Sequence, residues 1–299
     1  MSNYRLEGKT FVIDDYDRMP AFSSFLPGLA GVKGIPMWTF YTNRGQGMNS
    51  FGIDNKGNAI MEFNSANTAF ENTQVKGFRT FLKIDGQYYE PFFQYEDDAK
   101  RSIRMNKNSF KIIENNTKYG IEVTVNYYVL PNESIGALVR QVSVKNTGDK
   151  VKNIEIVDGL PKIITYGIAN GEFKEMSNLF KSWADIKNLE NKVPYYTLRA
   201  STKDSAEVSD VEGGYYYLTV RDGKLQDVIY DVDTVYGYDL SLMKPVNFVE
   251  GGIDKVLAKK QCFANKVPCG FTPFKAEIKA GEDFSFSTMI GFAGSVEQI

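Results

Sequence analysis

The chain is 299 residues long, 42% of its residues are hydrophobic and its formal charges sum to −2 at pH 7, a composition typical of a globular protein with one large domain or two of ordinary size. It contains no histidine, which excludes Ser-His-Asp and Cys-His catalysis and removes the commonest ligand of catalytic zinc. No cluster of Lys and Arg reaches the density of a nucleic-acid-binding patch, and no run of about 18 apolar residues is available to span a membrane, so we expect neither nucleic acid nor a membrane as a partner.

The N-terminal residues and the cysteines bear on the cellular compartment. Residues 1–17 are polar and acidic and lack the apolar stretch of a signal peptide, which predicts a cytoplasmic protein. The only cysteines are Cys262 and Cys269, too few for a disulfide scaffold or a four-cysteine zinc site. We interpret them as two reduced thiols, with a bridge across a hairpin as the alternative, and we expect no metal and no cofactor.

The first predicted strands form an aromatic meander. Met37–Tyr41 runs into a polar, glycine-flanked turn, which is followed by a second strand and a glycine turn that begins at Asp54. We expect the first of these turns to present Asn43, Arg44 and Gln46 at a strand end.

Those three side chains suit a polyhydroxylated ligand, because planar amides and a guanidinium supply several donors in fixed directions. They are our candidate substrate-binding residues, with Trp38 and Tyr41 as candidate rings for stacking on a sugar. The alternative is that Arg44 is a solvated hairpin residue and that Trp38 is buried in the middle of its strand.

Most of the remaining chain alternates apolar and polar residues between turn formers, which predicts antiparallel strands. The odd positions from Ile121 to Val129 are apolar, whereas Glu122, Thr124 and Asn126 lie on the other face, as expected for a sheet with one face in the core. Strands are predicted at Thr80–Ile84, Ile103–Met105, Phe110–Glu114, Ile121–Leu130, Ala137–Asn146, Lys152–Asp158, Tyr195–Ala200, Tyr215–Val220, Asp227–Asp231, Gln261–Ala264, Thr272–Ile278 and Phe284–Phe292.

One helix is predicted among the strands. Apolar residues that include Trp183 recur at helical spacing from Gly171 to Asn191, which predicts a helix of about five turns that ends before Pro194. We expect its apolar face to pack on the β-structure or on another domain. Residues 201–214, rich in Ser, Asp, Glu and Gly, are predicted to form a long surface loop.

The predicted class is mainly β: a large antiparallel β-sandwich that spans residues 1–299 as one domain and carries one inserted helix. The chain has 37 Asp and Glu residues, but no spacing singles out a catalytic pair. The acidic cluster Glu96-Asp97-Asp98 is interpreted as a solvated loop. No catalytic residue is assigned.

Six segments together carry a family resemblance. They are Ala21–Gly28, Gly34–Trp38, Asn43–Gln46, Gly77–Phe81, Val157–Pro161 and Asn191–Tyr196. In this order they resemble the N-terminal region of bacterial phosphorylases related to cellobiose and chitobiose phosphorylase, most of all the 1,2-β-oligoglucan phosphorylases. The resemblance extends from Phe11 to Phe292.

That family combines an N-terminal super-β-sandwich of the galactose-mutarotase-like type with a helical linker, an (α/α)6 barrel and a C-terminal β-layer. It cleaves a β-glucosidic bond with inorganic phosphate and inversion of configuration, and the Asp general acid belongs to the barrel. One protein carboxyl suffices, because phosphate replaces the activated water that a second carboxylate would serve.

The resemblance therefore implies a non-catalytic sandwich domain, since the sequence up to Ile299 has no counterpart of the barrel. Such a domain would pack on the barrel, take part in subunit association such as a homodimer, and lend the Arg44 loop to a site for a β-linked gluco-oligosaccharide. Inorganic phosphate would be the co-substrate of the whole enzyme.

Two other functions are compatible with a fold of this class. An independent carbohydrate-binding module would need exposed aromatic rings in a groove, and Tyr88-Tyr89 and Tyr215-Tyr216-Tyr217 are the candidate stretches. A free-standing sugar mutarotase or epimerase uses a His general acid, and the absence of histidine argues against it.

Overall fold

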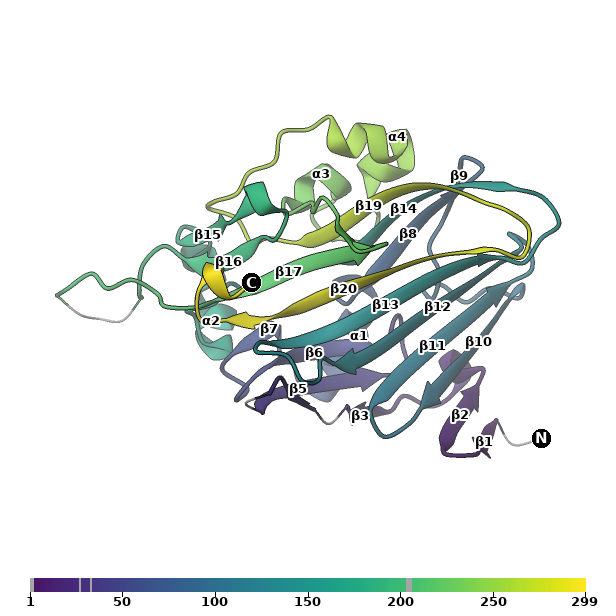
Figure 1. Cartoon of the computed structure of the whole chain (residues 1–299), viewed down its shortest axis with the longest axis horizontal. Helices are drawn as coiled ribbons and strands as arrows, with labels where there is room; N and C mark the ends of the chain where they lie inside the picture. Colours follow the sequence, from purple (N-terminus) through teal and green to yellow (C-terminus); the bar gives the residue numbers. More distant parts are fainter. Residues whose placement is uncertain (1–2, 27, 33, 203–205) are drawn as a thin grey trace.

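The computed structural model describes residues 3–26, 28–32, 34–202 and 206–299. The largest sheet in these ranges has eleven strands, and every neighbouring pair is antiparallel. Its spatial order is β1 (Tyr4–Glu7), β2 (Thr10–Asp14), β10 (Ala99–Met105), β11 (Ser109–Asn116), β12 (Ile121–Val129), β13 (Gly136–Asn146), β20 (Asp283–Ala293), β17 (Gly214–Arg221), β16 (Tyr195–Leu198) and β15 (Ala184–Lys187), with β18 (Lys224–Leu225) paired to β17 (Figure 1).

Two smaller antiparallel sheets form the second layer. One contains β19 (Gly270–Ile278), β14 (Lys152–Leu160), β8 (Arg79–Ile84) and β9 (Gln87–Tyr89). The other contains β3 (Ser23–Phe25), β5 (Ile35–Thr42), β6 (Met48–Ile53) and β7 (Ala59–Met61), with β4 (Leu29–Ala30) paired to β5. The predicted large antiparallel β-sandwich is confirmed.

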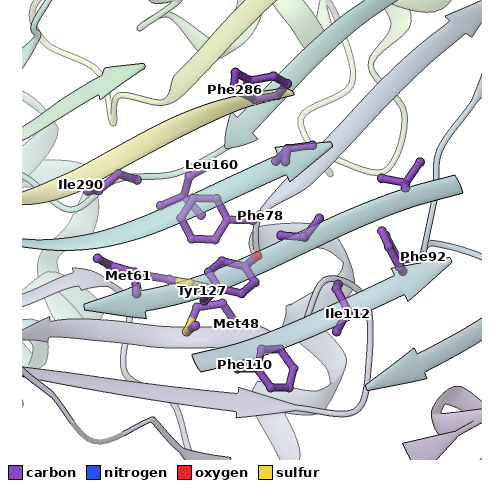
Figure 2. Packing of buried hydrophobic residues seen from close by; sticks show 14 of the residues in the cluster. Met48, Met61, Phe78, Phe92, Phe110, Ile112, Tyr127, Leu160, Phe286 and Ile290 are labelled. Atoms are coloured by element: carbon purple, nitrogen blue, oxygen red, sulfur yellow. The ribbon is translucent and has the colours of Figure 1, made fainter. Parts of the chain in front are cut away.

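The main core lies between these two layers. In β12 the odd residues from Ile121 to Tyr127 are fully buried and the residues between them are half-buried, so the predicted alternation is confirmed. Figure 2 shows Phe110 and Tyr127 of the large sheet in one cluster with Met48 and Phe78 of the second layer. The ring centroids of Phe78 and Tyr127 lie 5.7 Å apart, a normal distance for a packed aromatic pair.

Most predicted strands are present, but two are wrong. Residues 227–231 and 261–264 make only isolated bridges, because side chains take backbone groups that a strand ladder would use. The amide of Cys262 donates to Asp231 Oδ2 at 2.9 Å. Cys262 is exposed and Cys269 is buried, and both are free thiols, as predicted.

The described ranges contain more helices than the single one predicted. They are α1 (Ala66–Lys76), α2 (Asn170–Lys181), α3 (Val232–Tyr236) and α4 (Val246–Leu257), with 3-10 turns at Tyr16–Arg18, Leu189–Asn191 and Val296–Gln298. A second core cluster joins α3 and α4 to the face of β8, β14 and β19 that points away from the large sheet, as their positions in Figure 1 also show.

Two of the missed helices have sequence features that argue against a helix. The sequence of α1 is mostly polar and has little apolar periodicity. In α4 the pair Gly251-Gly252 resembles a loop, and the helix is indeed broken at Gly252, whose φ is 64°. The second half of α4 is capped from another element, because the amide of Ile253 donates to Glu155 Oε2 at 2.9 Å.

The predicted helix from Gly171 to Asn191 is wrong beyond Lys181. Residues 184–187 form β15, which pairs with β16, and Ala184 and Ile186 are buried on one face of that strand. A run of apolar residues spaced by three fits both a helix and this helix–turn–strand sequence. The ladder with β16 decided between them, because it gives the backbone hydrogen bonds that a longer helix would otherwise provide.

The apolar face of α2 is also narrower than predicted. Phe173 and Phe180 are each 4% exposed, whereas Met176 and Leu179 are 46% and 51% exposed. Trp183 follows the helix, is half-buried, and lies with its ring centroid 5.9 Å from that of Phe180. The helix therefore packs on the sandwich through its two phenylalanines.

This arrangement predicts unequal effects of truncation at adjacent positions of α2. Phe180→Ala is expected to lower the free energy of unfolding by about 3 kcal/mol, because it leaves a cavity in a closed cluster. Leu179→Ala is the matched control and should change it by less than about 0.5 kcal/mol, since half of that side chain already contacts water. Urea unfolding measures both, and equal losses would contradict this orientation of α2.

Candidate functional site

The polar turn after β5 lies in the interior, not at the surface as expected. Asn43 is fully buried. Its Oδ1 accepts a hydrogen bond from the amide of Phe22 at 2.9 Å, and its Nδ2 donates to the carbonyls of Tyr16 at 2.9 Å and Pro20 at 3.1 Å. The expectation that the turn presents Asn43 is therefore wrong, and the side chain ties residues 16–22 to the sandwich.

Gln46 is also buried, in a cluster that we call the buried polar centre: Gln46, Thr80, Arg140 and Asp158. Gln46 Nε2 donates to Thr80 Oγ1 at 2.9 Å, and Gln46 Oε1 accepts from Arg140. Thr80 Oγ1 donates to Asp158 Oδ1 at 2.6 Å, and the guanidinium of Arg140 binds the other carboxylate oxygen. The expectation that the turn presents Gln46 is therefore wrong, because its side-chain amide is buried in a closed hydrogen-bond network.

The buried polar centre is fully enclosed between the two layers. The side chains of Arg140 and Asp158 are 1% and 0% exposed, and Arg140 Nε donates to the hydroxyl of Tyr127 at 3.2 Å. Burial raises the pKa of Asp158, and the adjacent Arg140 opposes that shift. A buried pair with every group hydrogen-bonded is tolerated, whereas either charge alone would be costly.

Three of the six segments that carry the family resemblance meet at this centre. Gln46 belongs to Asn43–Gln46, Thr80 to Gly77–Phe81 and Asp158 to Val157–Pro161. These motif residues join β5–β6, β8 and β14 to β13 of the large sheet. Their positions make them determinants of the fold.

Arg44 is the turn residue that keeps partial exposure. Its Nη1 donates to the carbonyl of Asn43 at 2.8 Å and its Nη2 to the carbonyl of Met19 at 3.1 Å. It is therefore a half-buried structural donor, and its role in ligand binding stays a prediction.

The two candidate stacking rings pack within the protein. Tyr41 is 7% exposed and its ring centroid lies 4.2 Å from that of Phe110. Trp38 is half-buried, its Nε1 donates to the carbonyl of Asn55 at 2.9 Å, and its ring centroid lies 5.8 Å from that of Phe63. Of the aromatic stretches considered for a binding module, residues 215–217 are at most 1% exposed and offer no stacking surface.

The other aromatic stretch, Tyr88-Tyr89, lines an open hollow of about 370 Å³ beside β9, which we call the β9 pocket. It is lined by Tyr88, Tyr89, Glu90, Phe93, Gln94, Glu96, Tyr119, Met243 and Lys244. Rings and polar groups that converge on a concavity are the usual features of a small-molecule site.

One wall of the β9 pocket is fixed by Arg79, whose side chain is 1% exposed. Its Nε and Nη2 bind the two oxygens of Glu90 at 2.6 and 2.8 Å, and the guanidinium also donates to the carbonyls of Leu242 and Met243. The hydroxyl of Tyr88 donates to Glu90 Oε2 at 3.0 Å. Burial raises the pKa of Glu90, while Arg79 acts in the opposite direction. Arg79 therefore holds β9 and the α3–α4 connection together.

A second anchor beside the pocket is Glu114, which is 1% exposed. Its carboxylate accepts from Arg101 Nε at 2.6 Å, from the amide of Phe92 at 2.7 Å and from the hydroxyl of Tyr89. Phe92 has a φ of 64°, which a bulky residue adopts only when its surroundings impose it. The segment that lines the pocket is consequently anchored by Glu114 through Tyr89 and Phe92.

The β9 pocket has unused hydrogen-bonding capacity. Asn116 Nδ2 donates to one oxygen of Glu96 at 3.0 Å. Among the described residues, the second Glu96 oxygen, the side-chain amide of Gln94 and the ammonium of Lys244 have no hydrogen-bond partner. The ring of Tyr119 lies beside them, with its centroid 4.5 Å from that of Tyr89. Donors and acceptors next to aromatic faces match a polyhydroxylated ligand.

Sequence reasoning located this pocket only in part. It singled out Tyr88-Tyr89, but it interpreted Glu96 as a residue of a solvated acidic loop, whereas Glu96 is half-buried in the pocket wall. None of the five predicted site residues lines the pocket. Tyr119 and Met243-Lys244 carry no local signal, because only the fold brings them to β9.

The described residues contain no cluster of three or more Cys, Asp or Glu side chains arranged to hold a metal ion. No helix within these ranges has the length and hydrophobicity needed to cross a bilayer.

Comparisons with known proteins give only distant structural likenesses. No family model matches the chain, and no curated protein matches it significantly. A solved polysaccharide lyase aligns with a TM-score of 0.49 and 8% identity over 88% of this chain and 33% of its own. A bacterial glucoamylase in complex with acarbose aligns with a TM-score of 0.43 and 9% identity over 93% of this chain and 36% of its own.

A third solved structure is a putative kojibiose phosphorylase from the human microbiome, with a TM-score of 0.42 and 8% identity over 98% of this chain and 33% of its own. This chain thus spans about a third of the length of each of the three. The names of all three denote proteins that act on carbohydrates.

Proposed function

We propose that this chain is the non-catalytic β-sandwich domain of an inverting glycoside phosphorylase, and that its β9 pocket binds a β-linked gluco-oligosaccharide. The parent enzyme would transfer a glucosyl unit to inorganic phosphate and give glucose 1-phosphate. The sequence resemblance supports the assignment to a phosphorylase. The observation that carries the binding role is the set of unpaired polar groups beside Tyr119 in the β9 pocket.

The chemistry of the pocket fits binding better than catalysis. Glu90 Oε1 accepts from Arg79, and Oε2 accepts from both Arg79 and Tyr88, so most lone pairs of that carboxylate are already engaged and it is a poor candidate for proton transfer to a substrate. Gln94, Glu96 and Lys244 remain to bind hydroxyl groups. In this proposal the general acid comes from the (α/α)6 barrel, on which the domain packs, and a homodimer is the proposed assembly.

An independent carbohydrate-binding module is the second candidate function. The anchored walls of the β9 pocket favour it, since a preorganised site binds without help from another domain. The two functions differ in one respect: a module needs no barrel, whereas a phosphorylase domain works beside one.

Titration calorimetry of the chain with β-1,2-, β-1,3- and β-1,4-linked gluco-oligosaccharides tests the binding role. We expect at least one series to bind, and Tyr119→Ala to weaken that binding about five- to tenfold, because loss of a stacking ring costs about 1–1.4 kcal/mol. Glu96→Gln removes an acceptor of sugar hydroxyls and should weaken it to a similar extent.

Tyr128→Ala is the matched control, because Tyr128 lies at the other end of β12 from Tyr119 and outside the pocket. It should leave the affinity unchanged. Binding that is absent for all linkages, or equally weakened by both tyrosine variants, would refute the proposal. The same preparations with inorganic phosphate should form no glucose 1-phosphate, and turnover that survives repurification would place a catalytic acid on this chain.

A further inference from the structure

The outward face of the large sheet carries a second hollow, of about 540 Å³, over strands that Figure 1 shows side by side: β11, β12, β13, β20 and β17. Side chains on this face alternate with core residues, so they point away from the second layer. The polar residues that line it are Lys111, Thr124, Asn126, Gln141, Ser143, Arg221, Asp222, Ser285 and Ser287. None of them belongs to the β9 pocket.

The strand register arranges these side chains in straight rows. Lys111 lies opposite Asn126, Asn126 opposite Gln141, and Gln141 opposite Ser287. A parallel row two residues further along each strand contains Thr124, Ser143 and Ser285; in it, Ser143 lies opposite both of the others. Since neighbouring strands are about 4.8 Å apart, the first row crosses three gaps and extends over roughly 14 Å.

The rows differ from an ordinary solvated face in their chemistry. Apart from Lys111, their members are amides and hydroxyls, each of which can both donate and accept a hydrogen bond. On the same strands the next outward positions are Glu122 and Lys145, which lie opposite each other and form the kind of opposite-charge pair that stabilises an exposed sheet. Lys111, Arg221 and Asp222 also line the hollow, so its uncharged part is the stretch of the first row from Asn126 to Ser287.

Two atoms at the hollow lack partners although they are buried. Asn126 Oδ1 and Arg221 Nε have no hydrogen bond, while Asn126 Nδ2 donates to Gln141 Oε1 at 3.3 Å. A buried polar atom without a partner costs about 1–3 kcal/mol, and native structures keep few such atoms. Both residues line the same concavity, so one ligand that donates to Asn126 and accepts from Arg221 would satisfy both once the two side chains turn toward it.

We propose that this face binds an extended, neutral, polyhydroxylated chain, a linear glycan that runs across β11, β12, β13 and β20. Hydroxyl groups are donors and acceptors at once, as the amide and hydroxyl rows require, and a neutral chain suits the uncharged stretch from Asn126 to Ser287. The rows cross four strands and suit an extended polymer, whereas the β9 pocket, of about 370 Å³, suits a short oligosaccharide. This inference does not depend on the proposed function, since the two sites share no residue.

Affinity electrophoresis of the full chain through gels that contain laminarin, hydroxyethylcellulose or polygalacturonate tests the inference. We expect at least one of the two neutral glucans to retard the protein. The double variant Asn126→Ala/Gln141→Ala should bind that glucan at least about fivefold more weakly, and Glu122→Ala, an outward change on the same strand, should bind it normally. Equal urea midpoints of the parent and both variants exclude unfolding as the cause.

Tyr119→Ala separates this face from the β9 pocket and should be retarded like the parent. Retardation that is lost in Tyr119→Ala but kept in the double variant would assign glycan binding to the pocket and overturn the inference. The absence of retardation by both neutral glucans would overturn it as well. Retardation by polygalacturonate alone, abolished by salt, would show an anion site and would also refute it.

Discussion

Replacing Asp158 by Ala is expected to lower the free energy of unfolding by about 3–5 kcal/mol. The side chain is 0% exposed and binds both Arg140 and Thr80. Its removal leaves the guanidinium of Arg140 charged, because arginine does not lose its proton in proteins, in a site where that side chain is 1% exposed. Denaturant unfolding of the variant and the parent measures the loss.

A double-mutant cycle shows whether the loss comes from the charge left behind. Asp158→Leu combined with Arg140→Met removes both charges. The double variant should lose markedly less free energy of unfolding than the two single variants lose in sum, with an interaction energy of about 1–3 kcal/mol. Additive effects would mean that the buried polar centre contributes through shape alone. An unfolding midpoint of Asp158→Ala equal to that of the parent would contradict the burial of this pair.

The second large effect is expected for Arg79→Met, which should also cost about 3–5 kcal/mol. The substitution leaves the carboxylate of Glu90, 6% exposed, without its cation and removes the donor to the carbonyls of Leu242 and Met243. Because those carbonyls position Met243 and Lys244, affinity for the gluco-oligosaccharide should fall together with stability. Unfolding curves and titration calorimetry measure the two losses.

The loss of unfolding free energy in Arg79→Met should depend on pH in a defined direction. Without Arg79, burial raises the pKa of Glu90 further above its ordinary value of 4.5, so the folded state holds this proton more tightly than the unfolded state does. The contribution of Glu90 to stability is then greatest below about pH 4.5 and is lost as the pH rises through the folded pKa. The difference between variant and parent should therefore be larger at pH 7 than at pH 4.5.

Arg44→Met is the matched arginine control for this prediction. Arg44 is half-buried and donates only to the carbonyls of Asn43 and Met19 within the described residues. Losing two neutral acceptors costs about 1–2 kcal/mol, and no carboxylate is left unpaired. A loss for Arg44→Met as large as that for Arg79→Met would show that the Glu90 ion pair is not the cause.

The sequence by itself determined the β class and most of the strands. In β12 the alternation from Ile121 to Tyr127 is a local property, because successive residues of a strand face opposite sides whatever the strand pairs with. Local residue spacing does not determine where α2 ends, since the spacing of Phe180, Trp183 and Ile186 suits both a helix and the observed turn and strand. Pairing of β15 with β16 decided it.

Only the tertiary structure decided which polar residues are buried and where a ligand could bind. Gln46 resembles an exposed turn residue until Thr80 and Arg140, far away in the sequence, supply its partners in the interior. The β9 pocket likewise requires residues 88–96 to meet Tyr119 and Met243-Lys244. A polar side chain is buried only where distant partners satisfy it, and a pocket exists only where distant segments converge, so neither follows from local sequence.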